Sequence, residues 1–523
     1  MPAPDNQSFS DARIVAGILV TTGLVCALAT GTLIGSDDPL FLILGFGVAS
    51  VMAALVALQT NIWILIPMFW YLTGRLGFAP LPFSVRDIAV LVAFGGFVIL
   101  FAMRAIRGHA KSEFLDWLVF LNVGYLATVF VRNPAGVSAL GSHVVGGRPY
   151  LDSLIAFLAF IVLSRVTLRP GLARILPVLF CAPQIGVSLL GTLTHFIPST
   201  VPVVSRIYSG VDTSEYLSQE GPDDGTRVMD LFPGAKAGIA TLVSYFAPIT
   251  LLSPLHPLRF LCFLAVCAGF ALSGFRSGVV YLSVAFLLAA YFWGGFKRTL
   301  LVMTAIALVV LGLVCAQNAG LALPLTAQRA LSFLPGKWDE GAASDAEGSS
   351  EWRYYMWDVV LKSDTYIHNK LLGDGFGFSD YELQIMEQQQ QGGTGFIGAA
   401  QQEAFLIQGA FHNGPLSALR FVGGVGLFLY MALLVAAALY SWKLIRSSKQ
   451  TDYFPVALLF GIPAIYEPFQ YVLVFGGFDS GFPNTLFVCG MLKVISKALD
   501  ETAQVREAKL VNTVSLEEAR STT

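Results

Sequence analysis

Charged side chains are scarce in this sequence. Asp, Glu, Lys and Arg make up only 13% of the 523 residues, whereas 55% are hydrophobic, and the mean hydropathy is +0.68. A soluble domain cannot bury that much apolar surface, which excludes a soluble globular protein. The formal net charge of -2 gives no information on charged partners, and no nucleic-acid partner is expected. The composition indicates a polytopic membrane protein.

Cysteines are few, and groups that bind metals are lacking. The cysteines all lie in or beside apolar runs: Cys26, Cys181, Cys262, Cys267, Cys315 and Cys489. This placement is typical of small side chains that face lipid or other helices, not of a disulfide framework or a zinc site. No cluster of His, Asp and Glu has the spacing of metal ligands, so neither a metal nor a cofactor is expected. No internal repeat or matched pair of broken helices favours an inverted-repeat transporter.

Apolar runs long enough to cross a bilayer number about twelve to fourteen, which predicts an all-α polytopic fold. They lie near 12–34, 39–58, 61–73, 87–104, 114–132, 150–166, 172–197, 234–252, 258–274, 277–294, 299–319, 415–441, 453–475 and 482–498. The third is short, and 61–86 could instead be a re-entrant or interfacial piece. The first has no convincing small-residue cleavage site after it, so we expect a retained anchor and not a signal peptide.

Basic residues orient these segments. They cluster in four loops and are Arg104, Arg107 and Lys111; Arg165, Arg169 and Arg174; Lys297 and Arg298; and Lys443, Arg446 and Lys449. Because basic loops stay in the cytoplasm, both termini are expected inside, and loops 133–149, 198–233 and 320–415 outside. The chain then divides into N-terminal transmembrane helices (1–319), one large periplasmic loop with short helices (320–415), C-terminal transmembrane helices (416–498) and a cytoplasmic tail (499–523).

The large loop contains the first candidate residues, Trp352 and Arg353. They stand in a predicted amphipathic helix, Glu351–Ser363, whose apolar stripe also includes Tyr355, Met356, Val359 and Val360. Such a helix can lie on the membrane surface with its aromatic rings as a belt, which would put Arg353 at the level of lipid phosphates. The later segment Gly373–Gly377 lacks the strand and the Lys-Ser/Thr of a nucleotide loop, so we interpret it as a structural turn.

His412 and Asn413 stand where the loop re-enters the membrane. A histidine there titrates near neutral pH, and it could accept a proton from a sugar hydroxyl or donate a hydrogen bond to phosphate. The alternative is that His412 caps the helix, with Asn413 and Gly414 forming the turn and Pro415 starting the helix. The sequence alone leaves both interpretations open.

Two further arginines are expected on the outer side. Arg276 follows Ser273-Gly274-Phe275 between two apolar runs, where the small neighbours leave it open to an anion; the alternative is a side chain that snorkels to the interface. Arg227 precedes the segment that begins near Gly234, and nearby aspartates offer it a salt bridge instead.

Glu467 is a carboxylate deep in a late apolar run, between Pro463 and Pro468. An ionisable residue inside the membrane is a functional candidate by default, and the prolines break its helix. A buried ion pair with Arg276 or Arg420 is the structural alternative.

Four motifs together resemble the bacterial O-antigen ligase and O-antigen/exopolysaccharide polymerase superfamily. They are Arg227-Val228-Met229-Asp230-Leu231-Phe232-Pro233-Gly234, the segment Ser273–Gly278, Arg353-Tyr354-Tyr355-Met356-Trp357 with the Gly373–Gly377 turn, and Phe411-His412-Asn413-Gly414-Pro415-Leu416 ahead of Gly423-Gly424-Val425-Gly426. They cover roughly 227–441, and their order and placement are more specific than any one of them. The segment after Arg227 departs from the family in lacking a Pro-Asn pair.

The resemblance implies a metal-independent, inverting transfer of a glycan. The donor would be an undecaprenyl diphosphate-linked oligosaccharide and the acceptor a hydroxyl at the outer face of the bacterial inner membrane. Arginine suits this chemistry because its planar fork binds phosphate in two places and keeps its charge. We therefore expect Arg276 and Arg353 to hold the diphosphate with help from Arg227, and His412 to activate the acceptor. Asn413, Trp352 and Glu467 are further candidates for substrate binding.

The acceptor stays open at this point. A polymerase of exopolysaccharide or O-antigen repeat units is slightly favoured by the long acidic and Gln-rich loop, and an O-antigen ligase that uses lipid A-core is the alternative. A polysaccharide-lipid transporter is an alternative of another class. Membrane lipid, a chain-length regulator and a flippase are the further partners to consider.

Overall fold

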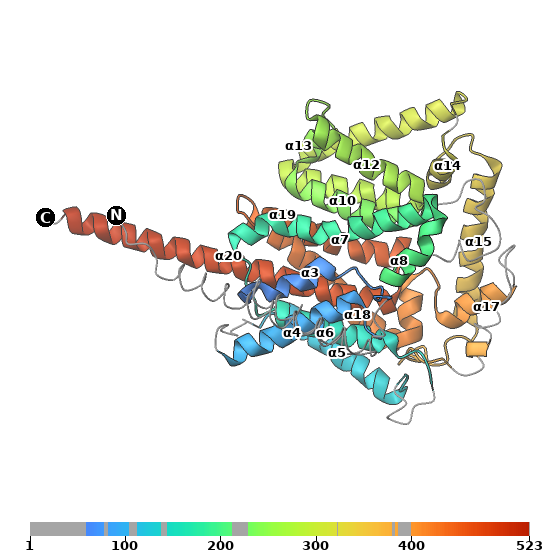
Figure 1. Ribbon diagram of the computed structural model, residues 1–523, viewed down its shortest axis with the longest axis horizontal. Coiled ribbons are helices and arrows are strands. Elements are labelled where there is room, and N and C mark those ends of the chain that lie inside the picture. Colours follow the sequence, from blue (N-terminus) through green and yellow to red (C-terminus); the bar gives the residue numbers. More distant parts are fainter. Residues whose placement is uncertain are drawn as a thin grey trace, which may run out of the picture.

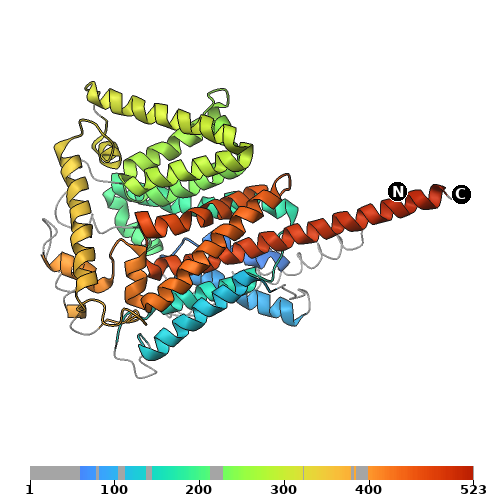
Figure 2. The ribbon, with the colours of Figure 1, turned by 180° about the vertical axis from the view of Figure 1, so that it is seen from behind.

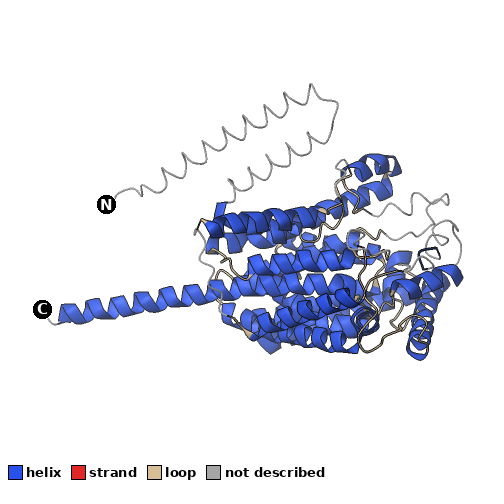
Figure 3. Cartoon of the chain, turned by 90° about the horizontal axis from the view of Figure 1, so that it is seen from below, coloured by secondary structure: helices blue, strands red, loops and turns tan. Residues whose placement is uncertain are grey.

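The described chain consists of helices. The computed structural model describes residues 59–77, 82–103, 112–136, 144–211, 228–321, 323–378, 382–384 and 399–521, and these ranges contain isolated β-bridges but no strand (Figure 3). Six helical segments in them are long and apolar enough to cross a membrane. The prediction of an all-α polytopic membrane protein is confirmed to that extent. The predicted spans 12–34 and 39–58 lie outside the described residues.

The helices have the following bounds. They are η1 (Gln59–Ile64), α3 (Leu65–Phe69), α4 (Val85–Ala102), α5 (Phe114–Arg132), α6 (Arg148–Leu163), α7 (Pro170–Phe196), η3 (Pro198–Thr200), α8 (Val201–Ile207), α10 (Leu231–Tyr245), α11 (Pro248–Leu251), α12 (Pro257–Ser273), α13 (Arg276–Asn318), α14 (Leu325–Leu331), α15 (Glu340–Lys362), α17 (Ala399–Gln408), α18 (Gly414–Ser448), α19 (Phe454–Phe469), η4 (Gln470–Val474) and α20 (Phe478–Ser521). The six candidate spans are α4, α5, α7, α13, α18 and α19 together with η4.

A bundle of helices forms the main core (Figure 1). α18 packs against α19, α20 and α5, α20 packs against α6, and α10 packs against α7 and α12. Large side chains such as Trp63, Phe160, Tyr430 and Phe487 are almost completely buried between these helices. The residues on the outside of α5, α13 and α7 are apolar as well, as expected for helices that face lipid.

The two ends of the bundle differ. α14, α15 and α17 lie together at one end, which we call the loop end, whereas the last part of α20 extends from the opposite end (Figures 1 and 2). α18 starts at Gly414 beside α17, so its first residue marks the loop end and Ser448 marks the other. The predicted tail, 499–523, continues α20 as far as Ser521.

Glycines divide two of the long helices. α13 has a non-helical residue at Gly295, with φ 72° and ψ -172°, so its parts correspond to the predicted segments 277–294 and 299–319. α18 is interrupted in the same way at Gly423, with φ 68° and ψ -177°. A side chain is disfavoured at a positive φ, so glycine is the residue expected at each kink.

The kink of α18 receives the glycine turn of the large loop. The amides of Asp374 and Gly375 donate to the carbonyls of Arg420 and Phe421 at 2.8 and 3.0 Å, and the Gly424 amide donates to the Lys370 carbonyl at 2.8 Å. The first two bonds use carbonyls of α18, and the third uses an amide of α18, that the kink leaves without helical partners. The prediction of a structural turn at Gly373–Gly377 is confirmed, with φ 82° at its first glycine.

The helix that carries Arg353 is longer than expected. The sequence predicts Glu351–Ser363, whereas α15 begins at Glu340. Glu340 lies in its first turn, where the negative charge interacts favourably with the positive end of the helix dipole. The alanines that follow have a high helix propensity. Arg353 is therefore in the middle of the helix and not at its opening. Of the predicted stripe, Met356 and Val360 are fully buried, but Tyr355 is 60% exposed.

Replacement of Gly373 tests the contact with α18. A Cβ atom there would lie 2.5 Å from the backbone of Val422, and the positive φ would disfavour it as well. We expect Gly373→Ala to lower the free energy of unfolding by more than the roughly 1–2 kcal/mol that the left-handed conformation costs by itself.

Thermal unfolding of the purified protein in detergent measures this effect. Gly124→Ala is the matched control, because nothing lies within 4 Å of a Cβ at that position in α5. We expect the control to leave the melting temperature unchanged or slightly raised. Equal melting temperatures for the two variants would contradict the proposed role of the turn.

Candidate functional site

A small hydrophobic cluster, separate from the main core, joins α15 and α17 to the start of α18. Its buried members are Met356, Val360, Ile367, Leu406, Phe411 and Leu416. Trp352 and Trp357 pack against it, and the Trp357 indole nitrogen donates to the Phe411 carbonyl at 2.9 Å. The cluster fixes the face of α15 that carries Arg353 against the residues just before His412.

Arg353 and His412 come within electrostatic range of each other. Arg353 precedes Trp357 by about one helical turn, so both side chains leave α15 on the same side. Burial and the positive charge of Arg353 lower the pKa of His412 below its usual value of 6.5. His412 is therefore neutral at neutral pH, and a neutral imidazole can accept a proton.

Arg353 is half-buried, and desolvation lowers the pKa of its guanidinium from the usual 12.5. In the part of the chain that the structure describes, no salt bridge joins it to a carboxylate. A guanidinium stays protonated at neutral pH even so. A half-buried cation without a carboxylate partner is a good binding group for an anion.

His412 has an unusual backbone and aromatic neighbours. Its φ is 49°, a left-handed conformation that few residues other than glycine adopt. Its ring centroid lies 5.2 Å from that of Phe475 and 6.0 Å from that of Phe405. Strained backbone of this kind occurs preferentially at functional sites, where the surrounding structure holds it in place.

Asn413 caps helix α18. Its side-chain oxygen accepts a hydrogen bond from the Leu416 amide at 3.0 Å, and Pro415 occupies the first turn. The Tyr471 hydroxyl donates to the Gly414 carbonyl at 2.6 Å and so ties this turn to the end of α19. The capping residue is thus Asn413 and not His412, as the alternative had it, and the helix begins one residue earlier, at Gly414. The role of Asn413 in substrate binding stays a prediction.

Arg276 is the first residue of α13, and it is half-buried. It follows Gly274, whose φ of 66° ends α12. α14 packs against both α12 and α13 and also against α15, so Arg276 and Arg353 belong to helices that share a neighbour at the loop end. Arg227 lies outside the described residues; the next residue, Val228, donates from its amide to the Leu272 carbonyl at 3.3 Å.

A cavity of about 510 Å³ lies beside this site. Its wall includes Phe475, the ring that contacts His412, and also Glu467. The cavity is at the loop end, because its wall takes residues from the starts of α4, α6 and α20, and the Phe478 amide at the start of α20 donates to the Ser417 hydroxyl in α18 at 3.0 Å.

Glu467 interacts with a residue that the sequence analysis did not name as its partner. Its charge interacts with that of Lys236 in α10, and both residues line the cavity. Arg420 instead lies 3.7 Å from Glu382 and donates to the Tyr366 carbonyl. The alternative of an ion pair between Glu467 and Arg420 is wrong, because the Arg420 guanidinium is held by Glu382 and the Tyr366 carbonyl.

Sequence reasoning missed the other charged groups of the cavity. Arg86 lies 2.6 Å from Asp152, and Arg148 lies 3.0 Å from Asp152 and also pairs with Asp87. Asp87 is completely buried and takes part in a capping box at the start of α4. The sequence does contain a signal for Lys236, because it is a cation within the predicted span 234–252, just as Glu467 is a carboxylate within a predicted span.

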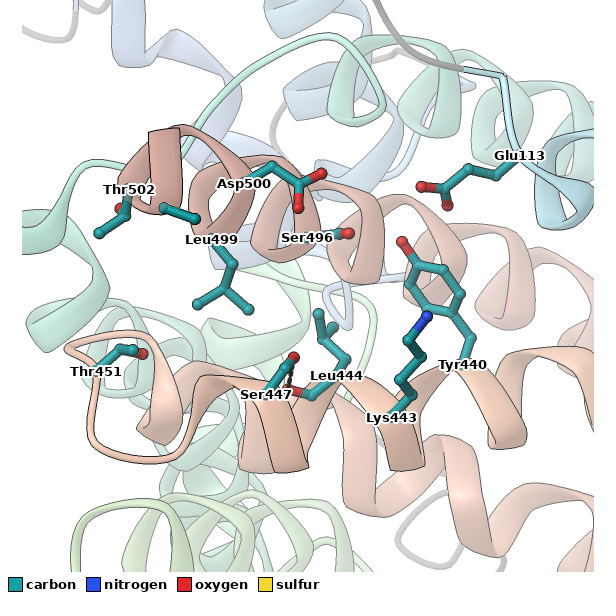
Figure 4. A pocket seen from close by; sticks show the side chains of 11 residues that line it. Glu113, Tyr440, Lys443, Leu444, Ser447, Thr451, Ser496, Leu499, Asp500 and Thr502 are labelled. Atoms are coloured by element: carbon teal, nitrogen blue, oxygen red, sulfur yellow. Dashed lines mark hydrogen bonds between the residues drawn. The ribbon is translucent and has the colours of Figure 1, made fainter. Parts of the chain in front are cut away.

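A second cavity, of about 610 Å³, lies at the opposite end of the bundle. Glu113 and Tyr440 approach each other across it, and Lys443 and Asp500 line it further along (Figure 4). The buried Lys493 lies nearby, 2.9 Å from Asp116 and 3.2 Å from Glu113. None of the predicted site residues lines this cavity, so the loop-end cavity is the one that belongs to the candidate site.

Comparison with known proteins adds nothing to these observations. No protein-family model matches the sequence, and no curated protein matches it. Among the residues that the structure describes, no group of three or more His, Cys, Asp or Glu side chains is placed to hold a metal ion.

The influence of Arg353 on His412 can be measured directly. Removal of the positive charge in Arg353→Gln should raise the pKa of His412, because a nearby cation disfavours the imidazolium. Burial still acts in this variant, so the value should stay below 6.5. An NMR titration of selectively labelled histidine gives the pKa.

Lys362→Gln is the matched control for this titration. It removes a charge of the same sign from the same helix, but Lys362 is exposed and paired with Asp358. We expect it to leave the pKa of His412 unchanged. Equal shifts in both variants, or none in Arg353→Gln, would show that Arg353 does not act on His412.

Proposed function

We propose that this protein is an inner-membrane glycosyltransferase that moves a glycan from an undecaprenyl diphosphate donor to an acceptor hydroxyl. The observation that carries the proposal is that Arg353 is close enough to lower the pKa of His412, whose ring contacts Phe475 in the wall of a polar cavity. A phosphate-binding cation and a proton acceptor are the groups that this reaction needs. The motifs that resemble the O-antigen ligase and polymerase superfamily include both residues.

The guanidinium groups stabilise the leaving group. As the bond between the anomeric carbon and the phosphate oxygen breaks, the electron pair stays on the diphosphate, which gains negative charge. Arg353, with Arg276 from the start of α13, stabilises this charge more in the transition state than in the ground state. The bound lipid places the diphosphate at headgroup level, where α15 lies along the loop end.

His412 acts on the acceptor. The acceptor oxygen forms its bond to the anomeric carbon while its proton passes to the imidazole, so that His412 serves as general base. Attack from the face opposite the diphosphate inverts the anomeric configuration. His412 has the protonation state for this role because burial and Arg353 keep it neutral.

We favour a polymerase of exopolysaccharide or O-antigen repeat units, in which the acceptor is another lipid-linked repeat unit. The alternative is an O-antigen ligase, in which the acceptor is lipid A-core. In both, the loop end faces the periplasm and both termini the cytoplasm. The glycan profile of cells that lack the protein separates them. Loss of a polymerase leaves single repeats on the core, whereas loss of a ligase leaves the core without any.

A polysaccharide-lipid transporter is the second candidate. It is favoured by the presence of polar cavities at both ends of the bundle. Its test is movement of the lipid-linked oligosaccharide across vesicles that contain the purified protein. Such movement without any glycosyl transfer would favour the transporter.

Substitutions at the site test the transferase. Arg353→Gln and Arg276→Gln should each reduce the rate of transfer by about 10²–10³, the typical loss of one charge-stabilising donor. His412→Asn should reduce it by about 10²–10⁴, because general-base catalysis is lost. Asparagine is the better replacement there, since it tolerates the left-handed backbone. The assay is transfer by the reconstituted protein with a lipid diphosphate-linked oligosaccharide.

Arg174→Gln provides the control. Arg174 is an arginine paired with Asp452 at the end of the bundle away from His412, and its side chain is 69% exposed. This variant should keep the parental rate. Parental rates in all three site variants, at equal amounts of folded protein, would reject the proposed site.

A further inference from the structure

The cationic side chains that line the loop-end cavity all have a carboxylate nearby, and the wall carries the further carboxylate of Asp479. Arg86 and Arg148 are both held by carboxylates, those of Asp87 and Asp152. Lys236 and Glu467 both line the cavity, and their charges attract each other. A diphosphate entering the cavity would have to displace these carboxylates and leave them unpaired at low dielectric, which is costly. The cavity therefore does not suit the anionic part of the donor.

The remaining wall combines aromatic rings with polar side chains. The Trp70 indole and the Tyr71 hydroxyl both donate to the Asn484 side-chain oxygen, at 3.1 and 3.0 Å. Trp70 is buried and stacked on Phe487, so this arrangement is rigid. Tyr71 and Phe475 are 41% and 47% exposed and present ring surface. Flat apolar rings beside amides and carboxylates match a sugar, which has C–H faces and many hydroxyls.

The size and position of the cavity agree with this chemistry. Its volume of about 510 Å³ lies within the roughly 300–1,000 Å³ typical of small-molecule sites. Phe475 belongs both to the cavity and to the surroundings of His412, because it lines the cavity and its ring contacts the His412 ring. A saccharide in the cavity would thus end next to the imidazole.

We propose that the loop-end cavity is a binding site for the uncharged acceptor saccharide, separate from the diphosphate site at Arg353. Its role as acceptor site rests on the proposed glycosyl transfer; its affinity for saccharide does not. The cavity orients the acceptor hydroxyl toward His412, while the arginines hold the donor on the other side. Tyr71 and Gln470 are positions where the wall can be altered with little loss of buried packing, because Tyr71 is partly exposed and Gln470 stands at the start of the short η4 turn.

Equilibrium binding to the full-length protein in lipid nanodiscs tests the proposal. One probe is the free oligosaccharide released by mild acid from the lipid-linked precursor of the producing cells, and the other is undecaprenyl diphosphate without sugar. Tyr71→Ala should weaken oligosaccharide binding about tenfold, as expected for loss of a ring contact and a hydrogen-bonded hydroxyl. Gln470→Ala, which keeps the rings, should weaken it by a smaller factor. Neither should change the binding of undecaprenyl diphosphate.

Three further variants serve as a neutral control, a donor-site control and a second test of the cavity. Phe196→Ala removes a ring that is 70% exposed and does not line the cavity, so it should change neither affinity. Arg353→Gln should weaken undecaprenyl diphosphate and leave the oligosaccharide unchanged. The double variant Lys236→Met/Glu467→Gln, which avoids an isolated charge, should weaken the oligosaccharide only. Only variants that keep the melting temperature of the parent protein are compared. If Tyr71→Ala does not fold, the effect of Gln470→Ala on oligosaccharide affinity decides.

Two results would overturn the proposal: oligosaccharide affinity that no cavity variant changes, or displacement of the oligosaccharide by undecaprenyl diphosphate. Failure of the transferase gives a different pattern. Oligosaccharide binding that depends on the cavity, in a protein without transfer activity, would support the saccharide site and reject the enzyme. Normal transfer activity, together with oligosaccharide binding that no cavity variant changes, would support the enzyme and reject the saccharide site.

Discussion

The contact between the glycine turn and the kink of α18 holds the loop end together. Gly373 and Gly423 lie so close that a Cβ on either would meet the backbone of the other's segment at about 2.4–2.6 Å. Tyr125 reinforces the contact, since its hydroxyl donates to the carbonyls of Leu372 and Val422 at 3.1 and 3.0 Å. The segment that directly follows α15, as far as Phe378, is thereby fixed on α18, and α15 can hold Arg353 near His412.

The carboxylate of Asp374 adds a second restraint to this turn. It accepts hydrogen bonds from the amides of His368 and Asn369, both at 2.8 Å. The turn thus satisfies its own backbone groups while it also pairs with α18. The strained backbone of His412 is held by other contacts, those of its neighbours Phe411 with Trp357 and Gly414 with Tyr471. The geometry of the proposed site depends on packing far more than on the local sequence around His412.

Much of the architecture could be predicted from the sequence, because hydropathy and glycine act locally. The helices, the break near Gly295 and the turn at Gly373 follow from composition and backbone preference. The start of α15 could not be predicted as easily, because Gly341 and Gly348 weaken the helical pattern before Glu351. The docking of Gly373 on Gly423 is a tertiary contact between residues whose partners no local pattern indicates.

The site was predictable in part. Arg353 and His412 could be identified as charged or titratable groups at membrane boundaries, and Glu467 as a carboxylate inside an apolar run. The structure places the first two near each other and the third in the adjoining cavity. Asp87, Asp152 and Arg148 were missed, because their significance lies in mutual pairing between α4 and α6. Sequence shows each charge but not its counter-charge. The glycosyltransferase assignment, the acceptor and the role of Arg227 stay predictions.

α20 has a consequence for the spacing of this protein from its neighbours. The helix continues along the bundle to Ser521, well past its packing against α6, α18 and α19 (Figure 1). At a rise of about 1.5 Å per residue, each ten residues beyond the bundle add about 15 Å of reach. A protein that bound the far end of this helix would be held at a distance from the bundle, and two copies of the chain could meet there without contact between their bundles.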